Sequence, residues 1–139
     1  MRVLAVDLGT KNIGTAVSDE LGISVRPLTS LRRTGLRHDL ARLKSLVKDL
    51  GAQAVVVGLP LRMDGSVGEA AQRALEFADK LRAETGVEVY TEDERLTSYE
   101  ADQMMIGQGL KRKQRRARSD EMAAAIILRD FLSRIKDHN

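Results

Sequence analysis

The sequence contains no cysteine and no tryptophan, and only two tyrosines and two phenylalanines among its 139 residues. Without cysteine the chain has no disulfide bond, no thiolate nucleophile and no cysteine-ligated zinc site. The shortage of aromatic rings argues against nucleic-acid binding by base stacking. No apolar run approaches the roughly 18 residues of a membrane span, and the N-terminus begins directly in a strand-like stretch. We therefore expect a cytoplasmic protein with no membrane-spanning segment and no leader.

Length and charge suggest one domain with a localised basic segment. A chain of 139 residues fits one domain, residues 1–139, and can bury roughly two thirds of its unfolded surface. Its net charge of +3 is uneven: the segment 111–118, KRKQRRAR, carries six positive charges, whereas the remainder has 17 basic and 20 acidic residues. Such a like-charge run is typically solvated and suits contact with backbone phosphates. The alternative is a solubilising loop.

The first 19 residues, MRVLAVDLGTKNIGTAVSD, predict a β-hairpin with an acid at its mouth. Four successive apolar residues, 3–6, indicate a central strand that is buried on both faces, and Asp7 follows them directly. An ionised carboxylate beside buried strands must find hydrogen bonds, a cation or a raised pKa. Asp7 is thus either a turn cap bonded to Gly9 or Thr10, or the first member of an acid site.

The later segments predict a mixed α/β fold. A third antiparallel strand over 23–31 carries Pro27, which suits an edge position. Ser66–Glu69 and Thr97–Glu100 have the spacing of capping boxes, and Ser119 is an N-cap candidate. The remaining expected elements are strands over 52–58 and 87–91 and helices over 36–50, 66–85, 97–106 and 119–134. The first of these helices is predicted from its leucine spacing, and Gly51 is expected to end it. Together they predict a five-stranded mixed sheet, three antiparallel strands followed by two parallel ones, with helices on both faces.

Acidic residues are expected to meet at one edge of this sheet. Ligands of open α/β sheets gather beyond the carboxyl ends of strands, where Asp7, Asp93 and Glu94 are all predicted. Asp120 shares helical spacing with apolar residues from 123 to 131, so its carboxylate is expected to face the sheet. Converging carboxylates repel one another unless a divalent cation holds them, and oxygen ligands favour Mg²⁺ or Mn²⁺. Such a site suits phosphodiester hydrolysis.

Each acid also has a purely structural explanation. Asp120 beside Ser119 would complement the dipole at the start of the last helix. The run Glu92–Glu94 would be a solvated strand end with Arg95 as its partner. The joint arrangement of these acids with Asp7 favours the metal site.

Four blocks of sequence carry a family resemblance. They are Asp7-Leu8-Gly9-Thr10 with Gly14, Val57-Gly58-Leu59-Pro60 with Asp64-Gly65-Ser66, Asp93-Glu94-Arg95-Leu96-Thr97-Ser98, and Ser119-Asp120-Glu121 with Ala123-Ala124-Ala125. In combination they resemble the YqgF/RuvX family of Holliday-junction-resolvase-like, pre-16S rRNA nucleases, and the resemblance covers nearly the whole chain. It implies a ribonuclease-H-like fold, metal-dependent nuclease activity and trimming of the 5′ end of the 16S rRNA precursor.

By position, the resemblance makes Asp7, Glu94 and Asp120 the metal ligands, with Asp93 as the alternative to Glu94. The related junction resolvases have their second acid after the first parallel strand, where this chain has Gly58 and no carboxylate, so that role is expected to pass to the next strand. The residues expected to bind nucleic acid are Lys11, Arg95, Lys111, Arg112, Lys113, Arg115, Arg116 and Arg118. Arg95 has pairing with a local acid as its alternative.

Three other functions remain open at this point. The same chemistry serves junction resolution in branched DNA, for which a homodimer is expected. A non-catalytic binding module would bind nucleic acid with a steep salt dependence and no turnover. Asp7-x-Gly9-Thr10 also resembles the first phosphate loop of actin-like ATPases, but those place nucleotide between two such domains and this chain supplies one. The sequence leaves open the polymer, the cleavage position, the number of metal ions and the oligomeric state.

Overall fold

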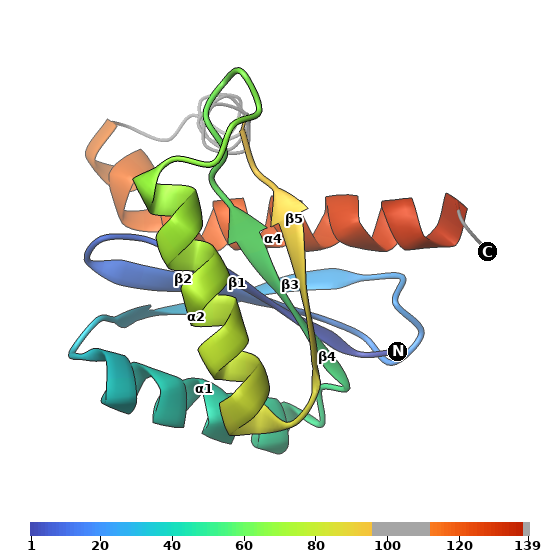
Figure 1. The fold of residues 1–139 in the computed structure, drawn as a ribbon. Helices are drawn as coiled ribbons and strands as arrows, with labels where there is room; N and C mark the ends of the chain where they lie inside the picture. The colour runs from blue at the N-terminus through green and yellow to red at the C-terminus, as the bar shows by residue number, and fades with distance from the viewer. Residues whose placement is uncertain (96–111, 138–139) are drawn as a thin grey trace.

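The computed structural model describes residues 1–95 and 112–137, with the side chains of residues 1–95 and 122–136. Its elements are β1 (Val3–Leu8), β2 (Asn12–Ser18), β3 (Val25–Arg32), α1 (Leu36–Leu50), β4 (Ala54–Leu59), α2 (Glu69–Thr85), β5 (Glu88–Asp93) and α4 (Arg112–Asp137). Figure 1 shows their arrangement. The helix expected over 97–106, with its capping box, lies outside the described residues.

The five strands form one mixed sheet in the order β3-β2-β1-β4-β5. β1 pairs antiparallel with β2 and parallel with β4, and β5 continues the parallel half beside β4. Pro27 lies in β3, which pairs only with β2 in this sheet and forms one of its edges. The predicted sheet, with three antiparallel strands followed by two parallel ones, is confirmed. Because β1 lies at its centre, Val3 to Val6 are fully buried.

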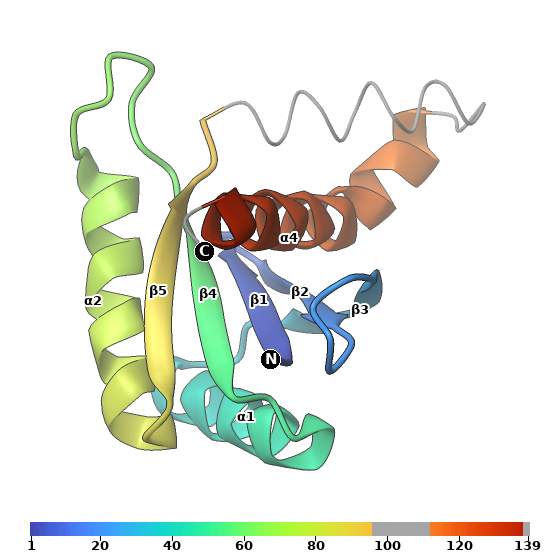
Figure 2. The same ribbon diagram turned by 90° about the vertical axis from the view of Figure 1, so that its right-hand side faces the viewer.

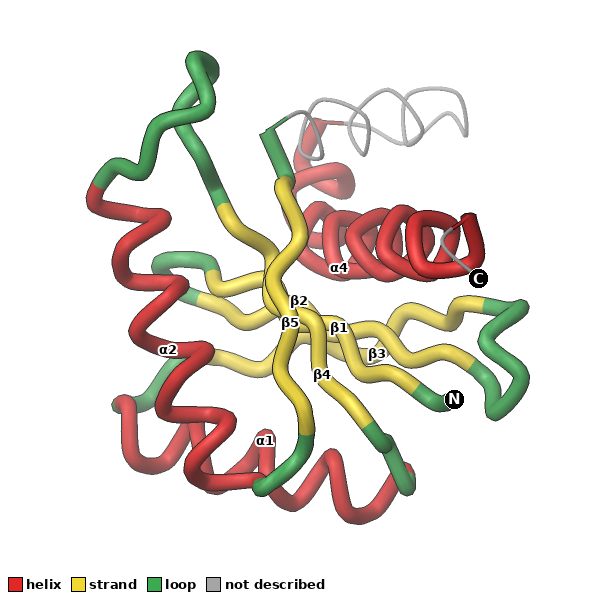
Figure 3. The backbone as a smooth tube through the Cα atoms, turned by 45° about the vertical axis from the view of Figure 1, so that its right-hand side comes forward, coloured by secondary structure: helices red, strands yellow, loops and turns green. Residues whose placement is uncertain are grey.

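Helices cover both faces of the sheet, as expected, and strand alternation assigns each buried residue to one face (Figures 1 and 2). On the face covered by α1 and α2, Leu4, Val6, Val55 and Val57 pack with residues of both helices. On the face covered by α4, the packed residues are Val3, Ala5, Ala54, Val56, Ala124, Ile127, Leu128 and Phe131. Acidic side chains at the ends of two strands can therefore come together only if both lie on the same face of the sheet. Figure 3 shows α4 on one side of the strands and α1 and α2 on the other.

Two predicted helix starts are wrong. α4 begins at Arg112 instead of Ser119, because 112–118 consists of strong helix formers and no glycine or proline lies between 112 and 137. Ser66 does not cap α2: its amide donates to the Asp64 carboxylate (2.8 Å) in a turn, and the helix begins at Glu69 behind Gly68 without a side-chain cap. Gly51 ends α1 in the left-handed conformation, as predicted.

The last strand is longer than its sequence pattern indicated. β5 runs to Asp93 instead of ending at Thr91, with Glu92 opposite Gly58 and Asp93 opposite Leu59 on β4. The cause is continued pairing with β4, which extends to Leu59. Two of the three acids expected after the strand therefore belong to it. Within the described ranges, the helices are too short or too polar to cross a bilayer.

Candidate active site

β1 delivers Asp7 to the face of the sheet that α4 covers. Val3 and Ala5 pack on that face, and Asp7 follows at the same two-residue spacing. In the register of the hairpin, Asp7 lies opposite Gly14, and its side chain is half-buried. The carboxylate therefore follows four fully buried strand residues, 3–6, as the sequence predicted.

The turn after Asp7 is tight and needs a glycine. The Gly9 amide, one expected partner of an Asp7 cap, donates instead to the carbonyl oxygen of Asn12 (3.0 Å). A Cβ atom on Gly9 would lie 2.7 Å from that same oxygen, so a larger residue would open the turn. Lys11, the predicted phosphate contact in this turn, is exposed, and its carbonyl oxygen accepts from the Arg33 amide (2.8 Å).

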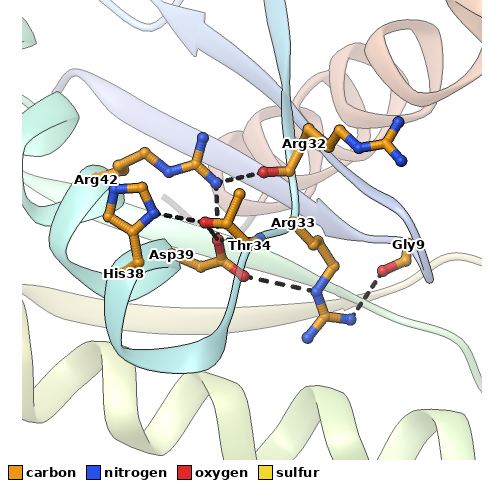
Figure 4. A network of polar contacts seen from close by, with 7 residues as sticks. All are labelled: Gly9, Arg32, Arg33, Thr34, His38, Asp39 and Arg42. Carbon is orange, nitrogen blue, oxygen red and sulfur yellow. Dashed lines mark hydrogen bonds and ion pairs between the residues drawn. The ribbon is translucent and has the colours of Figure 1, made fainter.

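A buried carboxylate, Asp39, ties this turn to the start of α1 (Figure 4). Its fully buried side chain accepts hydrogen bonds from the Thr34 amide (3.1 Å) and Arg42 Nη2 (2.7 Å), and Arg33 Nε lies 3.8 Å away. Arg33 in turn donates to the Gly9 carbonyl oxygen (3.0 Å). Burial acts to raise the pKa of Asp39, but these hydrogen bonds outweigh it and hold the pKa below its usual value. The network thereby stabilises the loop that follows Asp7.

The end of β5 brings Glu94 to Asp7. The Glu94 amide donates to the carbonyl oxygen of Leu59 (3.1 Å), which holds the residue beside the end of β4. The carboxyl groups of Glu94 and Asp7 are hydrogen-bonded to each other. Burial raises the pKa of Glu94 to about 9, helped by the charge of Asp7, this hydrogen bond and the charge of Asp93. Without a cation, the carboxyl pair of Glu94 and Asp7 therefore holds a proton at neutral pH.

Asp93 lies apart from this pair. It is exposed, and its carboxylate accepts from the Arg95 amide (3.0 Å) and from Arg95 Nε (2.9 Å). Arg95 also donates through Nη1 to the carbonyl oxygen of Met63 in the loop between β4 and α2 (3.3 Å). Both side chains are thus used in fixing loops at the sheet edge, and the structure pairs Arg95 with a local acid.

Glu92 and Arg134 form an ion pair that sequence reasoning missed. The Glu92 side chain is only 9% exposed, and its two carboxylate oxygens accept from Arg134 Nε at 2.7 and 3.0 Å. The Arg134 guanidinium also lies over the ring of Phe131, 5.5 Å from its centroid. The pair joins α4 to the strand that carries Glu94. The sequence signal that could have found it is the two-residue spacing from Glu92 to Glu94. If the strand continues past Thr91, this spacing places both side chains on the same face of the sheet.

The third expected acid, Asp120, belongs to α4. Position 120 precedes Ala124 by one turn and Ile127 by two, and both of those residues are buried against the sheet. The side chains of 112–121, which include the basic positions from Arg112 to Arg118, lie outside the described set, and so does Lys111 altogether. The meeting of Asp120 with Asp7 stays a prediction.

The donors at this edge suit a hard divalent cation. Asp7 and Glu94 offer carboxylate oxygens, and Glu94 Oε2 is buried without a hydrogen-bond partner among the described residues. A cation would take the place of the proton that the two carboxyl groups share. Within 1–95 and 122–136, no group of three or more histidine, cysteine or acidic side chains could hold a metal ion.

Comparison with known proteins places the whole chain in context. The family model described as "RuvX: Holliday junction resolvase" matches residues 1–134. A relative from Moorella thermoacetica named "Putative pre-16S rRNA nuclease" is 44% identical over 135 residues, which cover 97% of this chain and 96% of the relative. A relative of the same name from Geobacillus kaustophilus is 42% identical over 134 residues, with 95% of this chain and 97% of the relative covered.

Solved structures agree on the fold. Thermus thermophilus RuvC in complex with a Holliday junction substrate superposes with a TM-score of 0.59 at 22% identity, covering 97% of this chain and 96% of RuvC. The fowlpox virus Holliday junction resolvase gives a TM-score of 0.59 at 14% identity, covering 96% of this chain and 99% of the viral protein. At such identities the likeness concerns the fold alone, and it confirms the expected ribonuclease-H-like architecture.

Proposed function

The chain belongs to the RuvX family, and from that premise we propose that it is a metal-dependent endonuclease that cleaves phosphodiester bonds in structured RNA. The observation that carries the proposal is the pairing of Asp7 with Glu94. These two acids are far apart in the sequence and come together where β1 and β5 end. The names of its relatives support the 16S rRNA precursor as the substrate, and the proposal adds processing at the 5′ end of that precursor. The whole chain, residues 1–139, acts as one nuclease domain in the cytoplasm.

Three carboxylates are assigned to the metal. Asp7, Glu94 and Asp120 are the proposed ligands of Mg²⁺ or Mn²⁺, which when bound would activate water and neutralise charge on the leaving oxygen. Glu94 gives up its proton to the solvent on binding, because a ligating carboxylate must be ionised. The ion pair of Asp93 with Arg95 supports Glu94 over Asp93 as the ligand from this stretch.

Positive side chains on two elements are assigned to the RNA backbone. Lys11 is exposed in the turn between β1 and β2, and the other contacts are assigned to the start of α4 and the residue just before it. These other contacts are Lys111, Arg112, Lys113, Arg115, Arg116 and Arg118. Such contacts position a polyanion without reading its sequence. A phosphate contact from Arg95 would have to compete with its ion pair to Asp93.

The test is cleavage of precursor 16S rRNA in Mn²⁺ by Asp7→Asn and Asp120→Asn. Loss of a ligand should lower kcat/KM by at least about 100-fold, since even outer-shell changes at metal sites cost 10–100-fold. Asp130→Asn is the matched control, because Asp130 is an exposed acid on α4 that pairs with Arg129 (3.1 Å). Full activity in both ligand variants would overturn the metal assignment. RNA binding by the wild-type protein without any Mn²⁺-stimulated cleavage would favour the non-catalytic binding module.

A second candidate is junction resolution in DNA, which the description of the family model favours. The acid site would be the same, and a homodimer would be needed to cut two strands symmetrically. Competition between a four-way DNA junction and a folded rRNA precursor for one limited amount of enzyme separates the two substrates. Preference for the junction, with a dimer in solution, would replace the RNA assignment.

A further inference from the structure

The ends of β4 and β5 lie side by side under α4, and only one of them carries an acid (Figure 2). On β4, Ala54 and Val56 pack on the α4 face, so position 58 belongs to the same face. That position is Gly58, directly opposite Glu92 in the parallel register. Two residues beyond Glu92, Glu94 lies on this face as well.

The space beside Gly58 is already filled by Glu94. A Cβ atom on Gly58 would lie 2.2 Å from Glu94 Oε2 and 3.0 Å from Glu94 Cδ. It would also lie 2.6 Å from Cδ1 of Ile127 on α4. Real Cβ atoms do not approach other atoms this closely, so any larger residue at 58 forces a neighbour to move.

The effect of a larger residue at 58 on the acid site depends on whether Ile127 or Glu94 moves. Ile127 meets position 58 with the last atom of a flexible side chain, which can rotate away. Glu94 meets it with the carboxyl group itself, and the Glu94 backbone is held by its hydrogen bond to Leu59. A Cβ at 58 would therefore push the carboxyl group out of the space in which it bonds to Asp7.

We propose that Gly58 is a positioning residue of the acid site: its missing side chain admits the Glu94 carboxyl group from β5 into the space at the end of β4. This inference rests on the proposed function and extends it. The space holds one side chain, so an acid reaches Asp7 from β4 or from β5, and not from both. The role belongs to Gly58 through packing against Glu94, without contact to the substrate.

The first test is Mn²⁺ binding, measured by electron paramagnetic resonance. Gly58→Ala should weaken Mn²⁺ binding by about 10–100-fold, as other changes that misplace a ligand do. The matched variant is Gly58→Ala combined with Ile127→Val, which removes the Cδ1 contact and leaves the clash with Glu94. It should bind Mn²⁺ as weakly as Gly58→Ala alone. Recovery of wild-type affinity in this double variant would assign the effect to the helix and overturn the proposal.

The second test needs neither metal nor catalysis. In EDTA, Gly58→Ala should lower the melting temperature of the wild-type protein but not that of Glu94→Ala, because the smaller residue vacates the contested space. An equal loss in both backgrounds would overturn the proposal. If Gly58→Ala does not fold alone, folding of the double variant Gly58→Ala/Glu94→Ala supports it, and failure of the double variant overturns it.

Failure of this inference is distinguishable from failure of the proposed function. Wild-type Mn²⁺ affinity in Gly58→Ala, together with a loss in Glu94→Gln, overturns the positioning role and leaves the nuclease assignment intact. Wild-type Mn²⁺ affinity in Glu94→Gln overturns the ligand role of Glu94 and with it this inference, whereas the nuclease assignment stands or falls separately with Asp7→Asn and Asp120→Asn.

Discussion

Replacing Glu94 by glutamine should stabilise the protein in the absence of metal, although it removes a proposed ligand. Burial and the neighbouring Asp7 raise the pKa of Glu94 from 4.5 to about 9. The folded state thus binds this proton more tightly than the unfolded state does. The stability that this group contributes is fully present below about pH 4.5 and is lost as the pH rises toward 9. Glutamine does not titrate, keeps the shape of the side chain and can donate to Asp7.

The size of the effect follows from the two pKa values. A pH of 7 lies about 2.5 units above the pKa of this carboxyl group in the unfolded state. Each unit changes the free energy of unfolding by about 1.4 kcal/mol. The free energy of unfolding of Glu94→Gln should therefore exceed that of the wild type by up to about 3 kcal/mol at pH 7, and by little near pH 4.5.

Urea unfolding in EDTA at pH 5, 7 and 8.5 measures this difference. Glu88→Gln is the control, because Glu88 is an exposed carboxylate on the same strand. A difference between Glu94→Gln and wild type that does not grow with pH would refute the reasoning. Addition of Mn²⁺ should reverse the order, since binding to the folded state stabilises only a protein with its ligands intact.

Three further changes test the surroundings of the site. Arg134→Ala leaves Glu92 buried without its partner and should lower the free energy of unfolding by about 1–2 kcal/mol, given that Arg134 is half exposed; unchanged urea unfolding would contradict this. Asp39→Ala removes the carboxylate that holds two arginines and should cost about 3 kcal/mol in the same assay, with a loss under about 1 kcal/mol as the contrary result. The double variant Arg115→Gln/Arg116→Gln should bind single-stranded RNA with a weaker salt dependence. The slope of the logarithm of the binding constant against the logarithm of the salt concentration, measured by fluorescence anisotropy, should fall by about 0.7 for each lost phosphate contact. An unchanged slope would show that these two residues do not contact the RNA.

Local patterns in the sequence predicted most of the fold. Four apolar residues in succession, 3–6, indicated a strand buried on both faces, and β1 is the central strand. The leucine spacing over 36–50 and the glycine after it predicted α1 with its end. These signals are reliable because strand alternation, helix period and the conformation of glycine are properties of a few consecutive residues.

The errors arose where several structures satisfy the local rules. Ser66 had the spacing of a capping residue, but it lies in a turn in which its amide donates to the Asp64 carboxylate. Ser119 was a good N-cap candidate, yet the preceding residues are equally good helix formers and α4 starts at Arg112. The end of β5 depended on how far β4 remains available for pairing, which the sequence of β5 does not contain.

By itself, the sequence determined that an acid follows a strand buried on both faces and that further acids follow a parallel strand. Tertiary structure decided which of them meet. Strand register sends Asp93 toward Arg95 and Glu94 toward Asp7, and only the packing of β4, β5 and α4 shows that Gly58 leaves room for the Glu94 carboxyl group. The reason is physical: charge and chemistry belong to single residues, whereas burial, pKa and free space are set by neighbours far away in the chain.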